Sequence, residues 1–308
     1  MGGVDLTGRV ALVAGATRGA GRALAVELAR AGAFVFATGR SSRAWGLSDM
    51  ERPETIEETG DLIAAAGGQG SALRVDHLDA EAVRDLVDRI RRERGRLDVL
   101  VNDIFGGDRY AEWETPLWKH DLDGGLRMVR MGVETHIITA AVALPLILET
   151  GDGLLVEMTD GTSEANAGDR PGVGFYYDFV KASVDRLVRN FARDLRETRV
   201  TAVGVTPGWL RSERMLDGFG VTEATWRDFC GKEPSFGISE SPTYVARGVS
   251  ALAADPERGS FGGQVVTSRQ LADAYDVTDV DGSRPDCWKL IADHGWSEAD
   301  PEVIATYR

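Results

Sequence analysis

Short apolar runs rich in β-branched residues alternate along the chain with longer segments of helical period. The run Val10–Ala14 precedes a helical pattern over residues 22–30, and apolar residues recur at helical spacing over residues 80–94. This alternation predicts a parallel sheet with crossover helices. The expected fold is α/β, a Rossmann-like doubly wound parallel sheet of seven strands with helices on both faces. The predicted strands cover residues 10–14, 34–38, 72–75, 97–101, 154–158, 201–205 and 264–267.

Two long helices are predicted in the second half of the chain. Residues 129–148 are apolar on most faces and predict a long buried helix, and residues 179–196 predict another. The most apolar part of the first, residues 137–148, contains a proline and is too short to span a bilayer. A last helix is expected at about residues 243–253.

Three segments are predicted as additions to one domain that spans residues 1–308. Residues 41–60 are polar and predict a surface loop with a short helix. Residues 209–241 follow the sixth strand, where we expect a substrate lid. Aromatic residues in the tail at about 268–308 predict that it packs on the body or on a neighbouring subunit. These aromatic residues are Trp288, Trp296 and Tyr307.

Composition narrows the classes of partner. The chain has 35 basic and 49 acidic side chains, a formal net charge of -14. Such an acidic surface repels phosphate backbones and anionic headgroups, so neither a nucleic acid nor a membrane is an expected partner. Two cysteines and four scattered histidines predict no disulfide framework and no metal site. No secretory signal pattern is visible, so we expect a cytoplasmic protein.

The strongest local motif lies where the first strand turns into a helix. Gly15, Gly19 and Gly21 allow the backbone to turn tightly and to approach a pyrophosphate, which then sits at the positive end of the helix dipole. A glycine-rich turn without a ligand would have the same letters, but the strand-turn-helix context is the one that a nucleotide site needs.

The spacing of these glycines resembles that of the short-chain dehydrogenase/reductase family, and other family motifs follow in order over about residues 5–268. Tyr177 and Lys181 match the family's Y-x-x-x-K pair. Residues 113–116, 132–136 and 279–282 resemble more closely the branch of dehydrogenase/reductase family member 1, and this closer resemblance includes the tail.

The resemblance implies where a nicotinamide cofactor lies. Pro207 and Gly208 match the segment that faces the nicotinamide, and Asp76 matches the aspartate beside the adenine. Asn102 matches the first residue of the family's N-N-A-G motif, and Ser212 stands where the family has a cofactor-binding threonine. The cofactor site implied in this way comprises Gly15, Arg18, Gly19, Ala20, Gly21, Arg40, Asp76, His77, Asn102, Tyr177, Lys181, Pro207, Gly208, Leu210 and Ser212.

The residues after the second strand indicate which nicotinamide cofactor is bound. An NAD-specific site places a carboxylate there to hold the ribose hydroxyls. This chain instead has Arg40 and Arg43 with Ser41 and Ser42 between them, and Arg18 lies in the glycine loop. Guanidinium groups and hydroxyls around one point suit a ribose 2′-phosphate, so the sequence predicts NADP(H).

Hydride transfer to a carbonyl needs a group that protonates the developing alkoxide. A tyrosine hydroxyl can do this if a neighbouring ammonium lowers its pKa. Tyr177 and Lys181 are one helical turn apart and face the same side, so Tyr177 is the predicted general acid and Lys181 the group that tunes it.

The chain departs from the family at two catalytic positions. By register, Asp160 falls on the catalytic serine with Thr159 beside it, and Gly132 replaces a helix asparagine. Three explanations stay open. A hydroxyl of Thr159, Thr162 or Ser163 replaces the serine; or Asp160 is protonated and donates a hydrogen bond; or the substrate is a positively charged iminium that a carboxylate stabilises.

The resemblance therefore implies an NADP(H)-dependent oxidoreductase that reduces a carbonyl, or oxidises an alcohol, of a small organic substrate. Its catalytic candidates are Tyr177, Lys181, Asp160 and Thr159. Imine reduction is one alternative, and a non-catalytic NADP-binding sensor or scaffold is another. The resemblance also implies a homo-oligomer, a dimer or tetramer built through the long helices.

Overall fold

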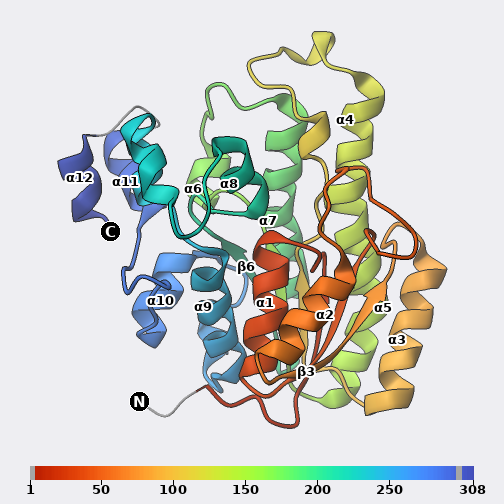
Figure 1. The fold of residues 1–308 in the computed structure, drawn as a ribbon. Helices are drawn as coiled ribbons and strands as arrows, with labels where there is room; N and C mark the ends of the chain where they lie inside the picture. Colours follow the sequence, from red (N-terminus) through yellow and green to blue (C-terminus); the bar gives the residue numbers. More distant parts are fainter. Residues whose placement is uncertain (1–3, 296–299) are drawn as a thin grey trace.

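The computed structural model describes residues 4–295 and 300–308. A seven-stranded sheet, parallel throughout, has the order β3-β2-β1-β4-β5-β6-β7. Figure 1 shows the helices packed around this sheet. The strand order reverses beside β1, and ligands bind at such a reversal, outside the carboxyl ends of the strands. The predicted doubly wound class is confirmed. The strands are β1 Val10–Ala14, β2 Phe34–Gly39, β3 Gln69–Arg74, β4 Val99–Asn102, β5 Gly153–Met158, β6 Val200–Thr206 and β7 Val265–Thr267.

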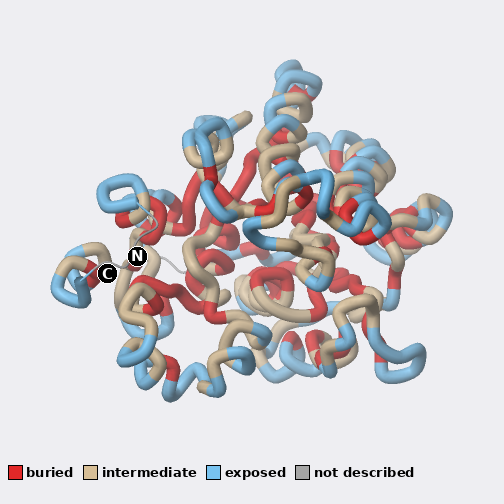
Figure 2. Tube along the Cα trace, turned by 90° about the horizontal axis from the view of Figure 1, so that it is seen from above, coloured by how far each residue is buried: buried red, intermediate tan, exposed pale blue. Residues whose placement is uncertain are grey.

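The alternation of side chains along β1 shows how the sheet is covered. Ala11 and Val13 pack into one apolar cluster with α1, α2, α9 and α10, whereas Val10 and Leu12 pack into another with α3, α5 and α7. Both faces of the sheet are therefore covered by helices and buried from solvent. In Figure 2 the buried segments run through the middle of the molecule, and exposed segments lie at its rim. These helices are α1 Gly19–Arg30, α2 Ile56–Ala65, α3 Ala80–Arg94, α5 Thr135–Thr150, α7 Phe175–Leu195, α9 Pro242–Ala254 and α10 Ser268–Tyr275.

The helix predicted over residues 129–148 begins earlier and is less buried. It consists of α4 Leu122–Val129, a π-helical turn Arg130–Glu134 and α5. Asp121 accepts hydrogen bonds from two main-chain N–H groups of the first turn and so starts the helix before its glycines. By length and composition Leu122–Thr150 could cross a membrane, but half of its most apolar window is buried and α5 packs on α3, β4 and β5. α5 is therefore a core helix packed on the sheet.

The helix predicted over residues 179–196 also begins earlier, because α7 starts at Phe175. This start places Tyr177 in the first turn of α7, and Tyr177 lines one pocket with Met158 at the carboxyl end of β5. The prediction started too late because residues 175–178 continue no apolar face: Phe175 is exposed, and Tyr176 is the buried residue of this turn.

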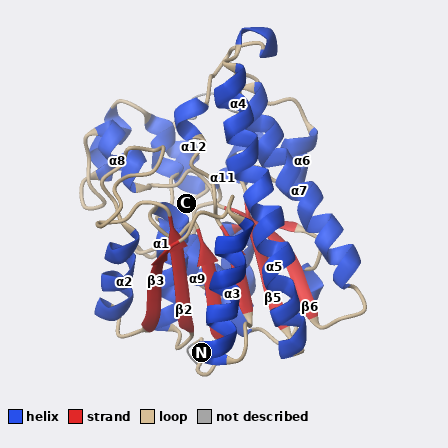
Figure 3. Ribbon diagram, turned by 90° about the vertical axis from the view of Figure 1, so that its right-hand side faces the viewer, coloured by secondary structure: helices blue, strands red, loops and turns tan. Residues whose placement is uncertain are grey.

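The lid and the tail lie together beyond the carboxyl edge of the sheet (Figure 3). Ile238 of the lid shares a small apolar cluster with Cys287, Leu290 and Ile304 of the tail. A tail packed on the body is confirmed for Trp288 and Tyr307, whereas Trp296 lies outside the described residues. The helices here are α8 Glu213–Phe219, α11 Cys287–His294 and α12 Pro301–Thr306, and a further short helix, α6 Ser163–Ala167, lies between β5 and α7.

Candidate active site

The glycine loop between β1 and α1 is packed too tightly for side chains. Gly15 has a φ of +91°, and a Cβ there would lie 2.3 Å from the carbonyl oxygen of Asp103. A Cβ on Gly21 would lie 2.4 Å from the carbonyl oxygen of Gly15. The loop therefore presents bare backbone at the N-terminus of α1, which is what a pyrophosphate needs.

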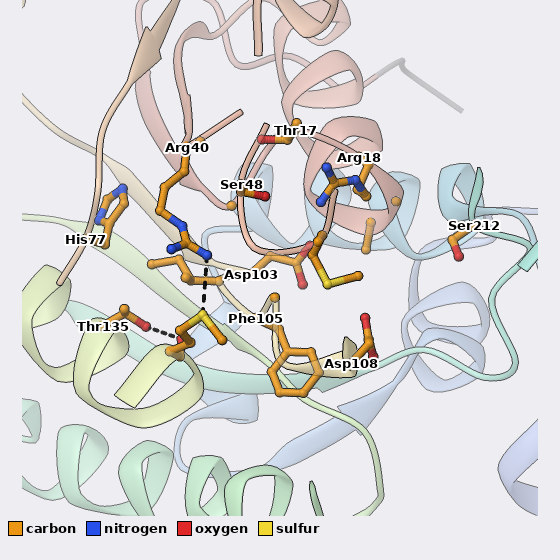
Figure 4. Close-up of a pocket in the computed structure, with 18 of the residues that line it drawn as sticks. Thr17, Arg18, Arg40, Ser48, His77, Asp103, Phe105, Asp108, Thr135 and Ser212 are labelled. Atoms are coloured by element: carbon orange, nitrogen blue, oxygen red, sulfur yellow. Dashed lines mark hydrogen bonds between the residues drawn. The ribbon is translucent and has the colours of Figure 1, made fainter. Parts of the chain in front are cut away.

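A pocket of about 250 Å³ lies over this loop (Figure 4). Its walls come from the carboxyl ends of β1, β2 and β4, the segment after β3, and the start of the lid. Gly21 and Asn102 do not line it, since Asn102 is fully buried and donates its amide to Glu157 at 2.8 Å. The predicted cofactor residues that do line it are Gly15, Arg18, Gly19, Ala20, Arg40, Asp76, His77, Lys181, Leu210 and Ser212.

At the end of β2, the place of the carboxylate that holds ribose hydroxyls in NAD-specific sites is taken by a glycine packed against the Thr17 hydroxyl. A Cβ on Gly39 would lie 2.0 Å from Thr17 Oγ1. Arg40 extends into the pocket instead, and its guanidinium contacts Met131 Sδ at 3.3 Å and Asp49 at 3.4 Å (Figure 4). Arg18 pairs with Glu54 at 3.0 Å, but its Nη2 atom is buried and has no hydrogen-bond partner among the described residues.

The basic cluster is smaller than the sequence predicts. Arg43 turns away and pairs with Asp61 at 2.6 Å. Ser41 accepts a hydrogen bond from the main chain of Ser48, and Ser42 donates to Glu57 at 2.5 Å. The expectation that Arg43 and both hydroxyls surround the phosphate is wrong, because the loop uses these groups for its own hydrogen bonds.

Two buried histidines lie at or beside this pocket: His77 lines it, and His136 contacts the main chain of the lining residue Ile104. His77 hydrogen-bonds Thr38 at 2.8 Å and Thr139 at 2.7 Å, and burial lowers its pKa to about 4, so the ring is neutral. His136 contacts Glu157 at 2.5 Å and the Ile104 carbonyl at 2.9 Å. Both partners accept hydrogen bonds, so both ring nitrogens of this buried histidine have hydrogen-bond partners within the protein.

A second pocket, of about 650 Å³, adjoins the first and contains the catalytic candidates. Asp103 lies on the wall of both pockets, and burial raises the pKa of its carboxyl to about 7. Lid and tail close the far side with mostly apolar side chains, so the tail belongs to the site. These closing residues include Trp209, Met215, Ile238, Cys287, Trp288, Leu290 and Ile291.

Tyr177 and Lys181 face this second pocket from α7. The Tyr177 ring packs edge-on against Phe105 and tilted against Trp113, with centroid distances of 5.7 and 5.0 Å. Lys181 Nζ lies 3.8 Å from the centre of the Phe105 ring and 5.5 Å from that of Tyr177. The predicted pair is therefore brought together, with an aromatic ring beside the ammonium.

The Tyr177 hydroxyl donates a hydrogen bond to Asp160 Oδ2 at 3.0 Å. Burial, followed by the nearby Asp160 charge, raises the pKa of Tyr177 well above its ordinary value. In the structure, burial and the nearby carboxylate therefore outweigh the lowering that was expected from Lys181.

Arg170 was not singled out by sequence reasoning. Its guanidinium is almost fully buried and contacts Asp160 Oδ2 at 3.0 Å, so the carboxylate at the family's serine position is paired. The signal that could have found it is that Arg170 is the single arginine in the segment between β5 and α7.

The hydroxyls that could replace the serine are engaged elsewhere. Thr159 lines the pocket, but its hydroxyl donates to the Lys181 carbonyl at 2.8 Å. Thr162 caps α6 and, like Ser163, does not line the pocket. At Gly132 a Cβ would lie 2.4 Å from Val180 Cγ1, so the family's asparagine would not fit.

Comparison with known proteins identifies this arrangement. The family model for short chain dehydrogenase matches residues 9–217. The chain belongs to the short-chain dehydrogenase family. The Mus musculus protein named dehydrogenase/reductase SDR family member 1 is 32% identical over 290 residues, which cover 90% of this chain and 85% of that protein. The Homo sapiens protein of the same name matches to the same extent, so the predicted branch is confirmed as well.

Solved structures of this short-chain dehydrogenase family share the fold. A 7α-hydroxysteroid dehydrogenase complexed with NADH and 7-oxo glycochenodeoxycholic acid has a TM-score of 0.68 at 22% identity, covering 91% of this chain and 96% of that one. A candidate 2-deoxy-D-gluconate 3-dehydrogenase from Agrobacterium tumefaciens with bound NADP has a TM-score of 0.66 at 21% identity, covering 87% and 97%. Family and fold together make this chain an oxidoreductase that binds a nicotinamide nucleotide.

Proposed function

We propose that the chain is an NADP(H)-dependent oxidoreductase that reduces a carbonyl, or oxidises an alcohol, of a small organic substrate. The observation that carries this proposal is that Tyr177 and Lys181 face a pocket which shares Asp103, Leu210 and Ser212 with the nucleotide pocket. Bound NADP(H) would supply or accept the hydride. Tyr177 would hold the proton at its hydroxyl, and Lys181 would contact the nicotinamide ribose and oppose the negative charge that develops beside it.

The choice of NADP(H) over NAD(H) rests on the end of β2. Gly39 supplies no ribose-binding carboxylate, Arg40 extends into the pocket, and Arg18 has a buried donor without a partner among the described residues. A phosphate between these two guanidinium groups would satisfy that donor.

A titration with NADPH and separately with NADH tests the cofactor. We expect a clear preference for NADPH, and we expect Arg40→Ala to weaken NADPH binding by about tenfold or more while NADH binding changes little. Arg43→Ala is the matched control, because Arg43 points away and pairs with Asp61. Binding of neither nucleotide would overturn the proposal and favour the scaffold function instead.

Reduction of an imine is the second candidate, and Asp160 favours it. A carboxylate 3.0 Å from the Tyr177 hydroxyl repels a developing alkoxide but stabilises an iminium cation. Turnover of matched ketones, alcohols and cyclic imines, followed by NADPH absorbance, separates the two chemistries. Failure of the wild type to turn over any imine would exclude the second candidate.

We also propose that the chain is a homo-oligomer. Leu126, Ile137, Phe175 and Phe179 are exposed apolar side chains on the long helices α4, α5 and α7. Contiguous exposed apolar surface commonly marks a protein interface. Light scattering after size exclusion would show a dimer or tetramer, and a monomer at all concentrations would refute this. The cytoplasmic location, and the lack of nucleic-acid and membrane partners, stay predictions.

A further inference from the structure

Asp160, Arg170 and Tyr177 form one hydrogen-bonded group on the wall of the substrate pocket. Asp160 Oδ2 accepts from the Tyr177 hydroxyl and from Arg170 Nη2, each at 3.0 Å. Arg170 Nη1 also donates to the main-chain carbonyl of Asp160 and to Asn166 Oδ1, both at 3.2 Å. A single guanidinium therefore holds Asp160 by its main chain and by its carboxylate.

Burial strengthens the ion pair between Arg170 and Asp160. The Arg170 side chain is only 4% exposed, and a guanidinium does not give up its proton in a protein. A buried cation of this kind needs an anion close by, because leaving it uncompensated is costly. Arg170 is therefore matched to Asp160 in its carboxylate form.

The hydrogen-bonding capacity of the site follows from this pairing. Tyr177 has one hydroxyl proton, and it is directed at Asp160 Oδ2. An ionised carboxylate only accepts, and within the described part of the chain nothing donates to Asp160 Oδ1. The Asp160 side chain is 36% exposed and lines the pocket, so the site offers acceptors to the reacting atom of a substrate.

We propose that Arg170 is a positioning residue that holds Asp160 as a carboxylate against Tyr177 and thereby selects an iminium over a neutral carbonyl. This rests on the proposed NADP(H)-dependent hydride transfer and, of the two candidate substrates, chooses the imine in its protonated form. An iminium N–H donates to Asp160, whereas a carbonyl oxygen in the same place would meet a carboxylate and a Tyr177 hydroxyl whose proton is directed at that carboxylate.

Reduction of an iminium by hydride needs no proton from an acid of the protein. Hydride from the reduced nicotinamide forms a C–H bond at the iminium carbon, and the C=N π electrons become the nitrogen lone pair. The product is a neutral amine that keeps its N–H, and the nicotinamide is oxidised. Tyr177 then orients Asp160 and does not need to transfer its proton.

The test measures kcat and KM for a cyclic imine and for the ketone of the same ring, with NADPH, in the wild type and in variants. We expect Arg170→Met to lower the ratio of imine to ketone kcat/KM by about tenfold to a hundredfold, the range for a hydrogen bond to a charged group. Most of the change should be in KM, because Asp160 stabilises the bound cation, and the positive charge of that cation is neutralised as hydride is transferred. Arg170→Lys should restore part of the ratio.

A double-mutant cycle separates positioning from a structural role. Arg170 acts through Asp160, so the double variant D160N/R170M should lose no more of the ratio than Asp160→Asn alone. Asp178→Asn is the matched control, because Asp178 approaches Arg170 at 3.8 Å without contacting Asp160 or Tyr177, and it should leave the ratio unchanged. Additive losses, or an unchanged ratio in Arg170→Met, would overturn the proposal.

A binding measurement keeps the proposal testable without turnover. In the presence of NADP, the wild type should bind piperidinium more tightly than cyclohexanol, and Arg170→Met should remove this preference. Equal binding of the two by the wild type would refute the selection of a cation. Failure of the proposed function is distinguishable, because it appears as loss of NADPH binding before any amine is added.

Discussion

The two halves of the active-site cleft are built by different means. In the nucleotide half, main-chain atoms lie so close to Gly15 and Gly21 that no other residue fits. In the substrate half, the wall consists of side chains from β5, α7, the lid and the tail. A pocket made of backbone keeps its shape and its ligand class, whereas a pocket made of side chains changes its chemistry with single substitutions.

The two halves of the cleft also differ in the charge of the side chains that line them. Arg40 and Arg18 face the nucleotide half, although Asp49 and Glu54 each accept part of their hydrogen bonding. In the substrate half a carboxylate, Asp160, stands where the family has a hydroxyl. The first arrangement suits a phosphate and the second a cation, so one cleft has opposite electrostatic preferences at its two ends.

The largest effect is expected from Tyr177→Phe, which tests whether turnover in the substrate half can be lost without loss of nucleotide binding in the other half. If Tyr177 is the acid for carbonyl reduction, ketone turnover should fall by about a hundredfold or more, the usual contribution of a general acid. NADPH affinity should not change, because the Tyr177 ring stays packed on Phe105 and Trp113. Stopped-flow kinetics and a nucleotide titration measure the two quantities, and a parallel loss of both would contradict the separation.

Gly39→Asp is expected to damage only the nucleotide half. The new side chain would collide with Thr17, and its carboxylate would stand beside Arg40, so NADPH affinity should fall by about tenfold or more. Gly218→Ala is a suitable control, because a Cβ there meets nothing within 4 Å. Gain of tight NADH binding in Gly39→Asp would show that the end of β2 has more room than the structure gives it.

A moderate effect is expected where the tail meets the nicotinamide segment. Trp288 Nε1 donates to the Pro207 carbonyl at 2.8 Å, and Cys287 packs against Gly208. Trp288→Phe removes one hydrogen bond of about 1 kcal/mol, so KM should rise about fivefold with little change in NADPH affinity. If KM stays constant while stability alone falls, the tail is a structural support and not a wall of the substrate pocket.

The smallest effect concerns pH and the buried Glu240 behind Gly208. Burial raises the pKa of Glu240 from 4.5 to about 8. Between pH 4.5 and about 8, Glu240 keeps its proton in the folded protein but loses it in the unfolded chain. The free energy of unfolding therefore falls as the pH rises through this range. Glu240→Gln cannot titrate, and its amide oxygen can still accept from Gly208 and Ser268. Melting temperatures across this pH range should fall less steeply in the variant, and equal slopes would contradict the assignment.

Prediction from sequence succeeded where a local pattern sets the geometry. The strand positions followed from short apolar runs, although β3 and the start of α7 were misplaced by three and four residues at their first residue. Gly132 was recognised as a departure, but the π-helical turn around it and the contact with Val180 depend on the packing of α7. Arg43 was misassigned because a basic residue in a loop does not reveal which acid it meets.

The sequence by itself determined the class of fold, the nucleotide loop and the pairing of Tyr177 with Lys181. These features depend on neighbours within a few residues, where periodicity and backbone freedom are decisive. Only the tertiary structure decided that Arg170 is paired with Asp160, that Thr159 is turned to the Lys181 carbonyl, and that the tail closes the pocket. Those contacts join elements far apart in the chain, and the direction of each side chain is set by burial and by the partners that it finds there.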